Sequence, residues 1–215
     1  MQFGFIPTYA WPVEGSHREH VKNIISQAEL AAKVGFDSIW FPHSFLNADY
    51  NRFQPLPMLG RLAAIDETLD LGVTYIITLE HPVSIAENLA TLASLTDGPV
   101  TLGALQGYVP QHFQAFGIPK RERTARFVEA IELLRRLWSE NNVTFDGEFF
   151  QVENATVNPS VDIPVFIGAN AEPSVKRAGR LGDGLVMSER TSIERGNVLM
   201  DRYREGLADS SRPSQ

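Results

Sequence analysis

Residues 2–12 read QFGFIPTYAWP, and this stretch decides between two folds that the chain could adopt. Residues 2–6 are mainly apolar after Gln2 and predict a first strand. In a doubly wound sheet that binds a dinucleotide, a glycine-rich loop follows the first strand. Here residues 7–12 contain two prolines and no glycine, so they cannot form that loop. The stretch therefore favours a TIM-type (β/α)₈ barrel over the doubly wound sheet.

The rest of the chain alternates short apolar runs with amphipathic stretches, which indicates βαβ units and a parallel sheet in an α/β protein. A complete barrel has eight strands, but the sequence predicts about six, so we expect an incomplete barrel that lacks its C-terminal strands. The chain is then either a fragment or a shortened form whose open edges a partner covers. We expect strands at 2–6, 38–41, 71–78, 100–105, 165–167 and 185–187, and helices at 18–34, 57–69, 82–95, 124–138, 173–181 and 193–207.

The expected organisation is one partial barrel domain over residues 1–207, ending in a polar tail at 208–215. Residues 106–120 contain glycine and proline with little periodicity and predict an insertion. Residues 143–152 predict a hairpin, because two apolar runs flank the turn pair Asp146-Gly147.

Composition excludes several classes of function. The formal net charge is −7, which argues against nucleic acid as a partner. The chain has no cysteine, no zinc-binding motif and no phosphate-binding P-loop, so we expect no metal site. No apolar run approaches the roughly 20 residues that span a bilayer, and no signal peptide is evident, so we expect a cytoplasmic protein without a membrane partner.

The active site of a barrel lies at the C-terminal ends of its strands, and two polar segments fall there. His43 directly follows the second strand, where it could move a proton or hydrogen-bond a flavin, or could only order its loop. Residues 168–174, GANAEPS, lie between a strand and a helix. Their small side chains would let backbone N–H groups approach a phosphate, although an ordinary turn with Asn170 as a helix cap is the alternative.

Five stretches, in order, resemble the bacterial-luciferase-like flavin-dependent oxidoreductases and together cover nearly the whole chain. They are AELAAKVGFDSIWFPH (28–43), HPVSIAENLATLASLTDGPVTLGALQGY (81–108), AFGIPKRERTARFVEAIELLRRLW (115–138), VTFDGEFFQV (143–152) and PVFIGANAEPSVKRAGRLGDGLVMSE (164–189).

The resemblance implies a cofactor at the barrel mouth, which is FMN or, in some branches of the family, a deazaflavin. It implies that His43 is the catalytic histidine and that Thr78 ends the third strand against the face of the cofactor ring. It also implies two groups of cofactor-binding residues. Gln106, Gly107 and Tyr108 would line the pocket beside the ring, and Gly168, Ala169, Asn170 and Ser174 would lie near the phosphate.

The expected function is that of a monooxygenase, in which reduced FMN and O₂ oxidise a small organic substrate and a separate reductase can supply the reduced flavin. A deazaflavin-dependent dehydrogenase and a non-catalytic flavin-storage protein are the alternatives. Because a partial barrel leaves strand edges exposed, we also expect a homodimer.

Overall fold

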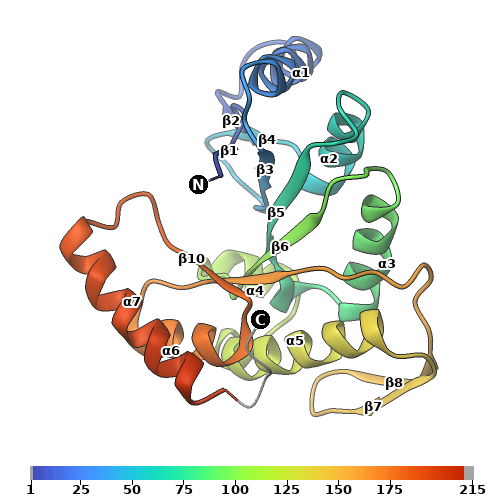
Figure 1. Cartoon of the computed structure of the whole chain (residues 1–215), viewed down its shortest axis with the longest axis vertical. Coiled ribbons are helices and arrows are strands. Elements are labelled where there is room, and N and C mark those ends of the chain that lie inside the picture. Colours follow the sequence, from blue (N-terminus) through green and yellow to red (C-terminus); the bar gives the residue numbers. More distant parts are fainter. Residues whose placement is uncertain (1, 211–215) are drawn as a thin grey trace.

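The centre of the molecule is a curled sheet of six parallel strands, seen in a computed structural model that describes residues 2–210 (Figure 1). The α/β fold with an incomplete barrel is therefore confirmed. In spatial order the strands are β1 (Gly4–Phe5), β3 (Ser38–Pro42), β5 (Asp70–Ile76), β6 (Val100–Leu105), β9 (Val165–Gly168) and β10 (Gly184–Val186).

Helices connect successive strands and follow one another around the outside of the sheet, and their ring is open between the first and the last helix (Figure 1). No helix among residues 2–210 is long and apolar enough to cross a bilayer. The connecting helices are α1 (His17–Lys33), α2 (Pro55–Ala63), α3 (Pro82–Ala93), α5 (Arg123–Ser139) and α6 (Glu172–Leu181), and α7 (Ile193–Ala208) follows β10.

The hydrophobic core lies between the convex face of the sheet and the helices. Alternate strand residues, such as Phe41, Val73 and Leu102, are fully buried there. They belong to one cluster with helix residues such as Leu89 and Leu134. The helix-covered face is therefore a packed core, because successive side chains of a strand point to opposite faces of the sheet.

The opposite face is concave, and two aromatic rings show how strongly it curls. Trp40 on β3 and Phe166 on β9 are three strands apart, which is roughly 14 Å in a flat sheet. Their ring centroids are only 6.4 Å apart. Gly72 makes room for this approach, because a Cβ atom there would lie 2.0 Å from the Trp40 ring.

Two predicted elements differ from the structure in how they end. The strand expected at 71–78 stops at Ile76, and Ile77–Leu79 forms a 3₁₀ turn, so Thr78 does not lie on a strand. The hairpin is present as β7 (Val143–Asp146) and β8 (Gln151–Ala155), but Asp146-Gly147 is not its two-residue turn. Asp146 pairs with Gln151 across a four-residue loop, because the Glu129 carboxylate of α5 accepts the backbone N–H groups of residues 148, 149 and 150.

The insertion expected at 106–120 is partly helical. It contains α4 (Pro110–Ala115), and a 3₁₀ turn, Lys120–Glu122, overlaps its end. Phe113 of α4 is buried in a small apolar cluster with Ile76 and Leu79, so the insertion packs against the end of β5.

Other differences are smaller. No pattern in the sequence indicated the ribbon formed by β2 (Ala10–Trp11) and β4 (Asn51–Arg52). Helix α2 lies at 55–63 where 57–69 was expected. Of the polar tail expected at 208–215, Ala208 ends α7, and residues 211–215 lie outside the described residues.

Candidate functional site

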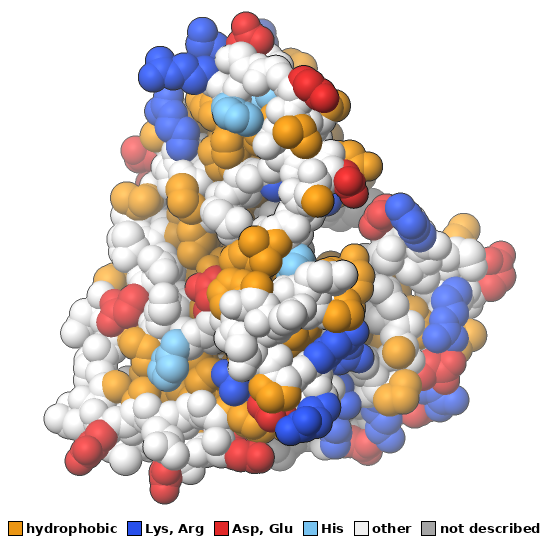
Figure 2. Space-filling view, turned by 180° about the vertical axis from the view of Figure 1, so that it is seen from behind, with side chains coloured by type: hydrophobic (Ala, Val, Ile, Leu, Met, Phe, Trp, Pro, Cys, Tyr) orange, Lys and Arg blue, Asp and Glu red, His pale blue; other side chains and the backbone are white. Residues whose placement is uncertain are grey.

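The C-terminal ends of the strands form one edge of the sheet, because all six strands are parallel. His43 follows β3 and Gly168 ends β9, so these two predicted site residues lie at the same edge of the molecule. Figure 2 shows the surface hollowed between the part that carries α1 and the part that carries α6 and α7. This hollow lies on the open side of the helix ring.

Two of the predicted cofactor-binding residues contact each other at this edge. The hydroxyl of Thr78, which is fully buried, donates to the backbone oxygen of Gln106 at 2.9 Å. The side-chain oxygen of Gln106 in turn accepts from the hydroxyl of Thr124 at 3.3 Å. A chain of hydrogen bonds therefore joins the turn after β5, the end of β6 and the first turn of α5.

The next two residues of the chain differ in their surroundings. Gly107 has a φ of +70°, and a Cβ atom there would lie 2.9 Å from the Ile76 side chain, so the position suits glycine. Tyr108 is 78% exposed. Its side chain is therefore mostly open to solvent, whereas Gln106 and Gly107 are half-buried.

The loop between β9 and α6 uses part of its polar groups internally. The N–H of Ala169 donates to the oxygen of Val186, which continues the sheet and leaves that donor engaged. The side-chain oxygen of Asn170 accepts from the N–H of Ser188, in the loop after β10. Asn170 therefore ties two loops together, and the alternative that it caps α6 is wrong, because the N-cap residue is Ala171 and no side chain caps the helix.

The first turn of α6 carries Ser174, which is half-buried, and a carboxylate that is already paired. Glu172 accepts from Arg195 at 2.8 Å and from Arg202 at 3.0 Å, both on α7. These hydrogen bonds lower the pKa of the Glu172 carboxyl below its usual value and keep it ionised. The negative charge of Glu172 is therefore paired with two arginines of α7.

The imidazole of His43 lies at the same edge but is almost entirely enclosed. It is 5% exposed, stacks on the Tyr75 ring at 4.0 Å between centroids and meets the edge of Phe45 at 4.2 Å. Its Nδ1 accepts from the N–H of Ile76 at 3.2 Å. The pKa of the ring is lowered to about 4, mainly by burial; a side-chain hydrogen bond with Gln54 opposes this shift, and the nearby His112 adds to it. The ring is therefore neutral near pH 7.

Sequence reasoning missed three residues that surround His43. Tyr75 donates from its hydroxyl to Glu80 at 2.7 Å, and Glu80 lies 4.0 Å from Nε2 of His43. Burial raises the pKa of the Tyr75 hydroxyl, so this proton stays in place. His112 lies on α4, buried to 5% exposure. Alternation along β5 could have placed Tyr75 on the core side, but nothing in the sequence indicates that α4 brings His112 close.

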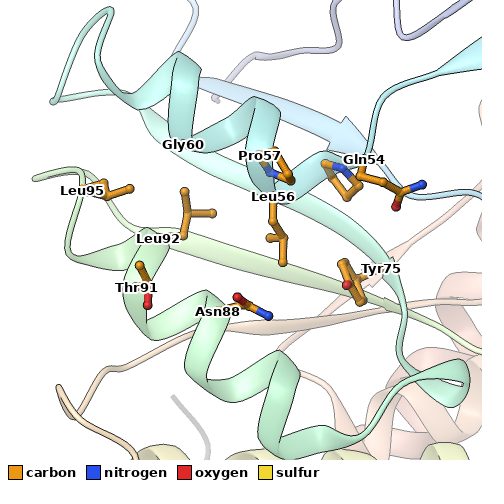
Figure 3. A pocket seen from close by; sticks show the side chains of 10 residues that line it. Gln54, Leu56, Pro57, Gly60, Tyr75, Asn88, Thr91, Leu92 and Leu95 are labelled. Carbon is orange, nitrogen blue, oxygen red and sulfur yellow. The ribbon is translucent and has the colours of Figure 1, made fainter.

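Two grooves are formed beside the helices, and the first of them reaches Tyr75 and Gln54 next to His43. A groove of about 510 Å³ opens between α2 and α3 on the helix side of the sheet (Figure 3), with Leu56 and Leu92 among its apolar walls and Gln54 and Tyr75 at its polar end. A second groove, of about 870 Å³, separates α5 from the β7–β8 hairpin. Neither is lined by the predicted cofactor-binding residues, whose role stays a prediction.

Comparison with known proteins identifies the family and changes the expected function. The family model for luciferase-like monooxygenases matches residues 1–215. The F420-dependent glucose-6-phosphate dehydrogenases of Beutenbergia cavernae and Kineococcus radiotolerans are 33% and 34% identical over 89% and 86% of this chain. The F420-dependent hydroxymycolic acid dehydrogenase of Mycobacterium tuberculosis is 31% identical over 81% of it. The chain spans 51–60% of the length of these relatives.

Solved structures share the fold along the whole chain. The monooxygenase RslO1 of Streptomyces bottropensis is 26% identical, with a TM-score of 0.88, over 100% of this chain and 68% of that one. An F420-dependent secondary alcohol dehydrogenase is 23% identical, with a TM-score of 0.84, over 99% of this chain and 65% of that one. At this lower identity the likeness concerns the fold alone.

These findings correct the expected function. The main expectation, a monooxygenase that uses reduced FMN and O₂, is wrong, because the curated relatives are dehydrogenases that depend on F420, a deazaflavin. The deazaflavin alternative agrees better with them. Because the family model matches this sequence from end to end, the chain belongs to the luciferase-like monooxygenase family.

Proposed function

We propose that this chain forms the coenzyme-binding part of an F420-dependent dehydrogenase, which moves a hydride between a deazaflavin and an organic substrate that carries a hydroxyl group. One observation carries the proposal. Relatives that are 31–34% identical over 81–89% of this chain are F420-dependent dehydrogenases.

Side chains at the strand-end edge and on the concave face support the proposal. The concave face offers the partly exposed rings of Trp40 and Phe166, which supply an apolar wall beside a planar ring. Beyond them, Gly168 presents no side chain, while Asn170 and Ser174 supply an amide and a hydroxyl near the N-terminus of α6. A helix N-terminus favours an anion, so these two residues fit the phosphate of the coenzyme tail.

The residues of the chain would bind and orient the coenzyme, and the deazaflavin would supply the hydride chemistry when bound. The hydrogen-bond chain from Thr78 through Gln106 to Thr124 fixes the backbone of two neighbouring strand ends. A fixed backbone at this edge supports the proposal, because hydride transfer requires a well-defined geometry between donor and acceptor.

The proposed class of substrate is an alcohol. Glucose 6-phosphate and hydroxymycolic acid, named for two of the relatives, both carry hydroxyl groups, and one solved neighbour is a secondary alcohol dehydrogenase. The carbon of such a group would lose a hydride to the deazaflavin and its oxygen would lose a proton to solvent, which gives a carbonyl product.

Titration of the purified chain with F420 and, separately, with FMN tests the proposal. We expect F420 to bind at least tenfold more tightly than FMN. We also expect Asn170→Ala to weaken F420 binding by about tenfold, because a hydrogen bond to a charged group contributes about 1.5 kcal/mol. Asn88→Ala, on α3 in the groove at the helix side, is the matched control and should bind F420 as the parent does. Tighter binding of FMN, or no binding of F420, would contradict the proposal.

A further inference from the structure

In the sheet, the imidazole of His43 accepts a hydrogen bond that its own backbone carbonyl would accept in a regular ladder. The N–H of His43 donates to the oxygen of Thr74 at 2.8 Å, as a regular parallel ladder requires. In such a ladder the next donor, the N–H of Ile76, would turn to the carbonyl of residue 43. It donates to Nδ1 of the His43 side chain at 3.2 Å. The last hydrogen bond between the segments of β3 and β5 is therefore accepted by a side chain and not by a backbone carbonyl.

This bond decides which nitrogen of the ring carries the hydrogen. Nδ1 accepts a hydrogen bond, so its lone pair is occupied, and the hydrogen of the neutral ring is on Nε2. Nε2 is buried without a close hydrogen-bond partner among the described residues, although the Gln54 side chain is near enough to raise the pKa of the ring.

The titratable groups that face the ring come from three neighbouring segments. Glu80 follows the 3₁₀ turn, with an oxygen 4.0 Å from Nε2, and Tyr75 of β5 lies under the ring. His112 of α4 acts on it electrostatically. Burial and His112 both lower the pKa of the ring and together outweigh the hydrogen bond with Gln54, so the ring is neutral and the Nδ1 lone pair stays available to Ile76 near neutral pH.

The bond to Ile76 also fixes the next three residues of the chain. Ile77, Thr78 and Leu79 form the 3₁₀ turn directly after Ile76, and all three are buried. The hydroxyl of Thr78 in turn donates a hydrogen bond to the backbone oxygen of Gln106. A change in the direction of the chain at Ile76 would therefore move the Thr78 hydroxyl and, through it, the end of β6.

We propose that His43 is a positioning residue whose Nδ1 lone pair fixes the backbone of Ile76, and with it the turn that carries Thr78. The inference rests on the proposed function only for its coenzyme readout. It concerns one atom, Nδ1, which makes it possible to separate it from a catalytic role.

Three substitutions at residue 43 test the inference. His43→Asn places an amide oxygen where Nδ1 lies, because both atoms are bonded to Cγ. His43→Gln extends its amide toward the position of Nε2, and His43→Leu offers no acceptor at all. Two properties are measured for each folded variant, namely the hydrogen-exchange rate of the Ile76 amide by NMR and the affinity for F420. In the parent, ¹⁵N NMR of the ring should find the hydrogen on Nε2.

We expect His43→Asn to keep the Ile76 amide protected and F420 affinity within about threefold of the parent. His43→Gln and His43→Leu should accelerate exchange of that amide and weaken F420 binding, each by at least tenfold. Rescue by glutamine without rescue by asparagine would overturn the inference, as would parent-like behaviour of His43→Leu or failure of all three variants alike. If the parent itself does not bind F420, the proposed function fails, while the exchange rates still decide the role of Nδ1.

Discussion

At the scale of single residues, the molecule depends on buried polar groups whose partners lie far away in the sequence. His43 bonds to Ile76, and Thr78 bonds to Gln106, across 33 and 28 positions of the chain. A buried polar group that loses its partner costs about 1–3 kcal/mol. These pairs therefore hold the strand ends in a single arrangement.

The neutral state of His43 makes stability depend on pH. Its pKa is about 4 in the folded chain, below the value of 6.5 expected on unfolding. The unfolded chain therefore binds this proton first, and the contribution of the group, up to about 3 kcal/mol, is lost as the pH falls from about 6.5 to 4. We expect the free energy of unfolding, measured with urea at several pH values, to fall more steeply over this window for the parent than for His43→Asn. Parallel curves would contradict the assignment.

The sequence predicted where His43 lies but not what its ring contacts. Position after an apolar strand was enough to place it at the C-terminal edge, because that rule depends only on the order of elements. The ring could point to the concave face or hydrogen-bond the neighbouring strand. Which of the two occurs depends on Ile76 and Tyr75, which lie on that other strand. No local pattern encodes that choice.

At the scale of elements, α6 and α7 approach so closely that glycines are required where they cross. A Cβ atom on Gly206 would lie 2.0 Å from the backbone oxygen of Lys176, and one on Gly179 would lie 2.2 Å from the oxygen of Tyr203. Backbone atoms cannot move aside as flexible side chains do. The contact is reinforced by ion pairs from Arg195 and Arg202 to Glu172.

Two glycines of α7 offer a matched pair of substitutions. Gly206→Ala should lower the free energy of unfolding by about 1–3 kcal/mol, because it overpacks the crossing. Gly196→Ala in the same helix has its nearest neighbour 4.0 Å away and should raise stability by about 0.5–1 kcal/mol, since alanine is the better helix former. Chemical denaturation measures both. Equal effects of the two substitutions would argue against the close crossing.

Helix and strand types were predictable because the 3.6- and 2-residue periodicities are strong over α1, α5 and the central strands. The ends of elements were less so. The hairpin shows why, since its turn pair Asp146-Gly147 has a favourable local sequence but gives way to Glu129 on α5. A carboxylate with three backbone donors outweighs the local preference of a turn.

At the scale of the whole molecule, the sheet has two open edges. Among residues 2–210, β1 pairs only with β3 and β10 pairs only with β9. Phe3 and Ile6, on either side of β1, are 60% and 52% exposed. Unpaired edges flanked by apolar side chains favour association with another chain.

We therefore expect the purified chain to form a homodimer through the edge at β1. Ile6→Lys should weaken self-association at least tenfold, because a charge on an edge opposes pairing. Leu30→Lys, on α1 and similarly exposed at 58%, is the control and should leave it unchanged. Sedimentation velocity over a range of concentrations measures the equilibrium. A monomeric parent, or equal loss in both variants, would contradict this interface.

One contact at the strand-end edge also restricts how this protein can vary. A Cβ atom on Gly168 would lie 2.2 Å from the Leu105 side chain, which comes from the neighbouring strand. Residue 168 can therefore gain a methyl group only if the Leu105 side chain moves to another rotamer or residue 105 becomes smaller. We therefore expect substitutions at these two codons to influence each other, although the codons lie far apart in the gene.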